Sequence, residues 1–250
     1  MRPSELRKMF CLEDTYWWFV ARREMVRRLL VKYRRLLPES PRVLDIGCGG
    51  GATLVMLSQA GRAIGLDRAE EALRLSRSRG RFPLVCGTAE RLPFADDSFD
   101  AVTALDVLEH IPDERAAVAE IARVCARGGL VIITVPAYQS LWSEHDEALD
   151  HIRRYRAGAV RKLLRDADLG TLRLSYCITA LLPPIFAVRR AQRLLGRADG
   201  ARPKTALRPL REWPNRLLIG LLALETSWLL RLPLPFGVSV VAVARKPSSA

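Results

Sequence analysis

The chain has 250 residues, of which 49% are hydrophobic and 27% charged, and its formal net charge is +13. This balance is that of a folded globular protein and excludes an intrinsically disordered chain. Five cysteines without a CxxC pair predict neither a disulfide framework nor a zinc site, so we expect no metal site and a reducing, cytoplasmic environment.

The positive charge is concentrated toward the two ends of the chain. Residues 1–37 carry a net charge of +6, residues 181–231 carry +7, and residues 232–250 add +2. Residues 38–180, in contrast, have a net charge of −2. We therefore expect a nearly neutral core flanked by basic segments with a role of their own.

The first segment is predicted to be a basic helical arm. Residues 16–37 place apolar side chains at helical spacing with arginines between them. Pro38 follows, and proline stops a helix because it lacks the backbone N–H. We assign the arm to residues 1–37.

A repeating order of strands and helices characterises residues 38–180. Short apolar runs, typical of strands buried on both faces, alternate with helical segments of about ten residues. Such alternation indicates βαβ units in a doubly wound, mostly parallel sheet. The predicted strands are 42–47, 63–67, 82–86, 99–105, 129–135 and 171–178, and the predicted helices are 52–60, 69–79, 113–126 and 157–167.

The regular alternation of strands and helices ends after the fifth strand. Residues 137–155 are predicted to form a polar, aromatic loop, and residues 181–231 a basic, apolar helical insertion. Residues 232–250 supply the last strand and a tail. The charge-free run 174–188 is too short for a transmembrane helix and contains two prolines.

A glycine cluster between the first strand and its helix predicts a cofactor site. Glycines there let the backbone turn sharply and approach a ligand at free helix-terminal N–H groups. Asp67 ends the next strand, where a carboxylate can accept hydrogen bonds from ribose hydroxyls. The pattern Gly47-x-Gly49-x-x-Ala52 also fits a dinucleotide site, so a nicotinamide dehydrogenase stays an alternative. Asp45 disfavours it, because a carboxylate suits an ammonium and a sulfonium better than a pyrophosphate.

The runs VLDIGCGGG, IGLD, GTAERLPFADDSFDAV and LDVLEHI, in this order over residues 43–135, resemble one enzyme family. They are similar to class I S-adenosylmethionine-dependent methyltransferases of the type 11 (ubiquinone/menaquinone-biosynthesis-like) group. YWWF…RR before these runs and W-S-x-H-D after them resemble a subset of that group. The resemblance implies S-adenosyl-L-methionine as cofactor and a seven-stranded Rossmann-like sheet, here with a helical arm and a helical insertion before the last strand.

The same resemblance assigns roles to the residues of the cofactor site. It implies that the loop of Gly47, Cys48 and Gly49 holds the methionine moiety and that Asp45 organises this loop. It also implies that Asp67 holds the ribose, that Asp106 lies near the methionine end and that Ala89 lies beside the adenine. Thr88 departs from the family, which usually has Asp there, so adenine binding is expected to be weaker.

His145 and His151 are the candidate catalytic residues. Both lie in the polar loop after the fifth strand, at the edge of the sheet where ligands bind in this fold. A hydroxyl acceptor needs a base, whereas a carbon or nitrogen acceptor needs little beyond alignment. His145 is slightly favoured because Asp146 is adjacent, and a solvated loop held by salt bridges is the alternative. For His110 we expect a packing role.

The basic ends favour a hydrophobic or lipidic small-molecule acceptor. Apolar helices with arginine and tryptophan at their rims resemble interfacial helices, so we expect peripheral contact with an anionic membrane at its inner face. No nucleic-acid partner is expected. Three alternatives stay open: a methyltransferase for a polar metabolite with dimerising ends, a non-catalytic cofactor-binding partner of a membrane enzyme complex, and ends that merely pack on the core.

Overall fold

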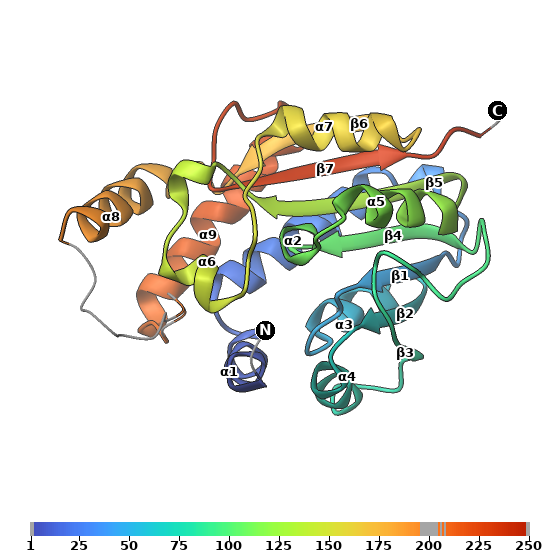
Figure 1. The fold of residues 1–250 in the computed structure, drawn as a ribbon, viewed down its shortest axis with the longest axis horizontal. Helices are drawn as coiled ribbons and strands as arrows, with labels where there is room; N and C mark the ends of the chain where they lie inside the picture. Colours follow the sequence, from blue (N-terminus) through green and yellow to red (C-terminus); the bar gives the residue numbers. More distant parts are fainter. Residues whose placement is uncertain (1–2, 196–204, 206, 208, 249–250) are drawn as a thin grey trace.

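The computed structural model describes residues 3–195, 205, 207 and 209–248. Its seven strands form one sheet in the order β3-β2-β1-β4-β5-β7-β6 (Figure 1). Strands β1 to β5 pair in parallel, and β7 runs antiparallel to both of its neighbours. This confirms the predicted doubly wound sheet. The strands are β1 Arg42–Ile46, β2 Arg62–Asp67, β3 Leu84–Cys86, β4 Phe99–Leu105, β5 Cys125–Pro136, β6 Gly170–Cys177 and β7 Ser239–Arg245.

Helices cover both faces of the sheet, as its apolar strands require. Alternate side chains of a strand point to opposite faces, so Leu44 and Ile46 of β1 pack on one side and Val43 on the other. The first side is covered by α5 (Glu114–Val124) and α7 (Ala157–Asp166). The second side is covered by α2 (Trp17–Lys32), α3 (Ala52–Ser58) and α9 (Glu212–Leu229).

Three differences from the sequence-based prediction concern helices. The predicted helix 113–126 is shorter, because the Asp113 side chain caps it by accepting from Ala116 N at 3.0 Å and Cys125 already begins β5. Helix α1 (Pro3–Leu12) lies in the predicted helical arm, ahead of the run 16–37 whose spacing predicted a helix. The polar loop contains helix α6 (Glu144–Ala148), whose capping box joins Ser143 and Asp146. The remaining helices are α4 (Glu70–Arg77) and α8 (Leu182–Leu195), with short 3-10 turns at Arg34–Leu36, Leu108–His110 and Gln139–Leu141.

The N-terminal arm and the insertion meet on the sheet, although about 200 residues separate them. The Asn215 side chain accepts a hydrogen bond from Trp17 N at 2.8 Å and donates one to Thr15 O at 2.7 Å. Further along, the Arg28 guanidinium donates to Ala223 O and to Ser227 Oγ of α9. Helices α2 and α9 therefore form one cover over the sheet, and residues 196–204, 206 and 208 of the insertion lie outside the described part of the chain.

Leu29 is a fully buried residue of α2, and replacing it tests how α2 packs on the sheet. We expect Leu29→Ala to lower the free energy of unfolding by about 2–5 kcal/mol, through lost transfer energy and the cavity left behind. Val31→Ala on the exposed face of the same helix should change it by less than about 0.5 kcal/mol. Denaturant titration followed by circular dichroism measures both, and equal effects would contradict the packing of α2.

Candidate functional site

A cavity of about 1690 Å³ lies at the carboxyl ends of the parallel strands. The strand order reverses between β1 and β4, which is the position where open α/β sheets bind ligands. The cavity wall combines the loops after β1, β2, β3 and β4 with side chains of α2, of residues 137–155 and of α8. The sequence-predicted cofactor residues and all three histidines line it: Asp45, Gly47, Cys48, Gly49, Asp67, Ala89, Asp106, His110, His145 and His151.

The glycine loop after β1 turns sharply and packs closely against the protein. Gly47 has φ +69°, and a Cβ added to it would lie 2.5 Å from Cγ2 of Val107. Gly47 N donates to Leu66 O at 2.7 Å, which fixes the loop to the end of β2. A side chain at this position would therefore both strain the backbone and collide with its neighbour.

Asp67 lies at the end of β2 and faces this loop. Its carboxylate accepts hydrogen bonds from Gly49 N at 3.0 Å and from Ala69 N at 2.8 Å. Burial raises the pKa of Asp67, and these two hydrogen bonds oppose the rise. Each carboxylate oxygen still has acceptor capacity for a ligand hydroxyl. Thr88 and Ala89 line the same cavity after β3.

Asp45 and Asp106 occupy the ends of β1 and β4. Asp45 Oδ1 accepts from Thr103 Oγ1 at 2.6 Å, and burial raises the pKa of Asp45 to about 7. This hydrogen bond joins Asp45 to the neighbouring strand β4 and not to the glycine loop. It therefore does not support the predicted role of Asp45 in organising that loop. Asp106, at φ +57°, accepts from Thr134 Oγ1 at 3.2 Å and forms an ion pair with Arg22 of α2.

Two residues of the N-terminal segment complete the cofactor side of the cavity. Glu13 had no signal in the sequence, whereas Arg22 lies in the YWWF…RR run, to which no site role was assigned. Glu13, between α1 and α2, accepts from Gly50 N at 3.3 Å and pairs with Arg79 at 3.2 Å. Burial raises the pKa of Glu13 despite that arginine. Arg22 stacks on Trp18, with its guanidinium 4.5 Å from the ring centroid. Only the fold brings these residues beside the glycine loop.

Asp146 organises the opposite wall of the cavity. This carboxylate is fully buried, accepts from Ser143 N at 2.8 Å and from Arg154 Nε at 2.7 Å, and lies 2.9 Å from His151 Nδ1. Arg189 of α8 lies 3.7 Å from its second oxygen. Burial alone would raise the pKa of Asp146, but the contacts with His151 and Arg154 hold it below its usual value.

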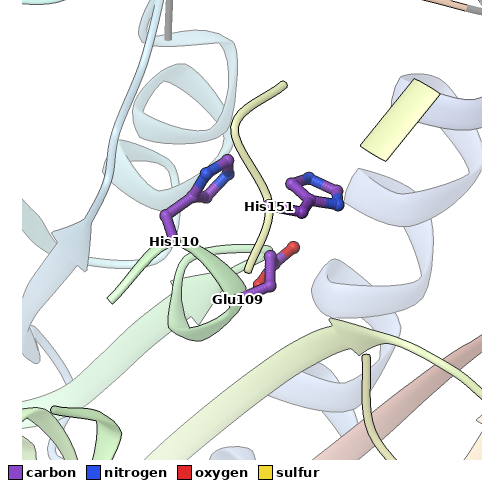
Figure 2. A group of neighbouring side chains, drawn as sticks. All are labelled: Glu109, His110 and His151. Carbon is purple, nitrogen blue, oxygen red and sulfur yellow. The ribbon is translucent and has the colours of Figure 1, made fainter. Parts of the chain in front are cut away.

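The three histidines differ in environment. The His151 ring is held by Asp146, and it meets the His110 ring edge-on with centroids 4.8 Å apart (Figure 2). Burial lowers the pKa of His110 to about 4 and that of His145 to about 3. The adjacency of His145 to Asp146 in the sequence was therefore misleading, since the aspartate hydrogen-bonds His151. His110, for which we expected packing alone, lies in the cavity wall.

Residues 44–133 match the family model described as a methyltransferase domain. The chain carries a class I S-adenosylmethionine-dependent methyltransferase domain of the type 11 group. Its cofactor is S-adenosyl-L-methionine, which agrees with the several desolvated carboxylates around the glycine loop, because the cofactor brings an ammonium and a sulfonium to them.

Relatives of this methyltransferase domain include two from mycobacteria. A probable S-adenosylmethionine-dependent methyltransferase of Mycolicibacterium smegmatis is 32% identical over 163 residues, which cover 62% of this chain and 60% of the relative. A demethylmenaquinone methyltransferase of Mycolicibacterium paratuberculosis is 40% identical over 93 residues, covering 37% and 40%. The chain thus spans about half the length of the curated relatives that it matches.

A solved structure extends the likeness in fold to nearly the whole chain. A chain in the complex between the Haloferax volcanii Trm112 methyltransferase activator and the putative methyltransferase superposes with a TM-score of 0.62 at 21% identity. The match covers 98% of this chain and 96% of that chain. The likeness in fold therefore extends beyond residues 44–133.

We expect Asp67→Ala to weaken S-adenosylmethionine binding by about 1–3 kcal/mol, because hydrogen bonds to a charged group are lost. Calorimetric titration of the folded variant measures this change. Asp166→Ala, which removes an exposed aspartate on α7 outside the cavity wall, should leave the affinity unchanged. An unchanged affinity in Asp67→Ala would contradict the ribose assignment.

Proposed function

We propose that this chain transfers the methyl group of S-adenosylmethionine to a hydrophobic or lipidic small molecule. The observation that carries the proposal is a single cavity that joins the cofactor side to an apolar opening. Its volume of about 1690 Å³ exceeds the roughly 300–1,000 Å³ of a typical ligand pocket, so it has room for two molecules. The apolar residues at the α8 and α9 side are Ile178, Leu181, Pro184, Ile185, Val188 and Leu218.

Methyl transfer from the cofactor is an in-line displacement, in which the sulfonium supplies both the methyl group and a good leaving group. This chain's residues would mainly align the two molecules and exclude water. Arg22, from α2, adds a positive charge that could pair with the carboxylate of the methionine moiety. The demethylmenaquinone methyltransferase among the relatives supports a lipophilic acceptor, because its name denotes a quinone-type substrate.

His151 is our first candidate for the base that a hydroxyl acceptor would require, and His145 is the second. Asp146 holds Nδ1 of His151 and so leaves Nε2 facing the cavity as a proton acceptor. His145 is a weaker base, since burial lowers its pKa to about 3. A carbon or nitrogen acceptor would need neither residue.

The direct test incubates the protein with an isotopically labelled methyl donor and lipid or aqueous extracts, and mass spectrometry identifies the labelled product. Our proposal predicts label in the organic phase. Label confined to polar metabolites would favour the alternative acceptor class. Cofactor binding without any labelled product would favour a non-catalytic partner of another enzyme.

With the labelled acceptor in hand, we expect His151→Asn to lower turnover by about 10²–10⁴-fold while cofactor affinity stays unchanged. His145→Asn is the matched comparison, because it removes an imidazole from the same cavity. A loss below tenfold in both variants would contradict a histidine base and indicate a carbon or nitrogen acceptor.

We further propose that the acceptor enters from an anionic membrane surface through the exposed face of α9. This face, the α9 stripe, carries large apolar side chains at spacings of three and four residues, while Leu222 and Leu229 on the opposite face are buried. Its residues are Trp213 (70% exposed), Leu217 (62%), Leu221 (38%), Leu224 (67%) and Trp228 (61%). None of the described helices is long and apolar enough to cross a bilayer.

Charge and position support a lipid surface as the occupant of the α9 stripe. The segment 181–231 carries a net charge of +7, and tryptophan favours the region between headgroups and acyl chains. Leu218, the neighbour of Leu217, lines the cavity, so an acceptor could pass from the bilayer into the site. Trp17 and Trp18 do not contribute to this surface, because they line the cavity instead.

We expect the protein to sediment with liposomes, more strongly as the anionic lipid content rises and less strongly at high salt. The double variant Leu217→Asp, Leu224→Asp should reduce binding at least tenfold, because it places two charges in the stripe. Leu172→Asp, on the edge strand β6, is the matched control and should bind normally. A wild-type protein that stays in the supernatant under all conditions would contradict the membrane proposal.

A further inference from the structure

Glu109, His110 and His151 form a compact cluster in the wall of the cavity (Figure 2). Glu109 and His110 belong to the 3-10 turn after β4, and His151 follows α6. One ligand atom from each residue lies within 4.8 Å of the others. Ile152 N donates to Glu109 O at 2.8 Å and joins the two segments.

Glu109 is the member of the cluster that most needs a partner. Its side chain is fully buried, and neither carboxylate oxygen has a hydrogen-bond partner among the described residues. An unpaired buried carboxyl is costly, and a cation between it and the two imidazoles would satisfy it.

The His151 imidazole is oriented as a metal-binding histidine is. Histidine ligands usually hydrogen-bond a carboxylate or a carbonyl through the nitrogen that does not bind the metal. His151 Nδ1 lies 2.9 Å from Asp146 Oδ1, which leaves Nε2 free to ligate. The His110 ring lies edge-on to the His151 ring, with the ring centroids 4.8 Å apart.

We propose that Glu109, His110 and His151 bind one divalent transition-metal cation. Two imidazoles and one carboxylate suit Zn²⁺, Fe²⁺, Co²⁺ or Mn²⁺, and three protein ligands leave coordination positions open, as in catalytic sites. Ligand atoms at about 2.0–2.2 Å from a cation lie about 3–3.5 Å apart, so small side-chain rotations would close the cluster around the ion. The expectation of no metal site was based on the cysteines alone. It did not consider this set, because His110 and His151 lie 41 positions apart in the sequence.

The open positions face the cavity and would take water or an oxygen of the methyl acceptor. A cation there would lower the pKa of a bound hydroxyl, and His151 would then act as a ligand rather than as a base. This role rests on the proposed methyl transfer. The binding of the ion does not, because it can be measured without any acceptor.

Metal binding by the full chain tests the site. The protein, freed of tags and chelators, is titrated with Co²⁺ and followed by its visible absorption, and Zn²⁺ is then added as a competitor. We expect one equivalent of Co²⁺ to bind and Zn²⁺ to displace it. Glu109→Gln and His110→Ala should each weaken Co²⁺ binding at least tenfold, whereas His145→Asn, an imidazole outside the cluster, should change it less than twofold.

Unfolding temperature and S-adenosylmethionine affinity show whether each variant is folded. If Glu109→Gln does not fold, His110→Ala and the rise in the wild-type unfolding temperature with Zn²⁺ still test the site. The proposal is wrong if the wild type binds no cation, or if both cluster variants bind it as the wild type does. It is also wrong if His145→Asn loses binding equally.

The methyl-transfer assay separates this proposal from the proposed function. Metal binding at the cluster together with an absence of labelled product would contradict the methyl transfer and leave the site standing. Labelled product that is insensitive to a chelator, together with no bound cation, would overturn the metal site alone.

Discussion

The fully buried carboxylate of Asp146 is the constraint on which the acceptor side of the molecule depends. A charge without water must be compensated, and here Arg154, His151 and the backbone N–H of Ser143 do so, with Arg189 nearby. Because these groups come from the 137–155 segment and from α8, their shared partner holds both segments over the sheet edge. The same contact orients His151, so the carboxylate that holds these segments in place also positions the candidate catalytic histidine.

The two ends of the cavity differ in their charge balance, and this difference decides what each can bind. Asp146 is surrounded by cations, whereas burial raises the pKa values of Asp45, Asp67 and Glu13 around the glycine loop. Desolvated carboxylates disfavour a pyrophosphate and favour a ligand that carries positive charge. A doubly wound sheet can bind either a nicotinamide dinucleotide or S-adenosylmethionine. The acidic residues at the strand ends favour S-adenosylmethionine, because its sulfonium is positively charged.

The parts of this account that sequence patterns predicted are local ones. Alternating apolar runs predicted the sheet, and a strand–glycine–helix pattern followed by Asp67 predicted the cofactor loop. Contacts between distant segments carried no such signal: Glu13 on Gly50, Arg22 on Asp106, and Glu109 beside His151 exist only once the chain has folded. His145 was ranked first because of adjacency in sequence, yet side chains one residue apart on a helix point in different directions, and Asp146 hydrogen-bonds His151.

A crystal structure with S-adenosylhomocysteine, the product form of the cofactor, tests the central claim most directly. The account predicts this ligand in the large cavity, with its ribose hydroxyls hydrogen-bonded to Asp67, its adenine beside Thr88 and Ala89, and its amino-acid end against the Gly47–Gly49 backbone. Density for the ligand outside this cavity, or with its ribose away from Asp67, would contradict it.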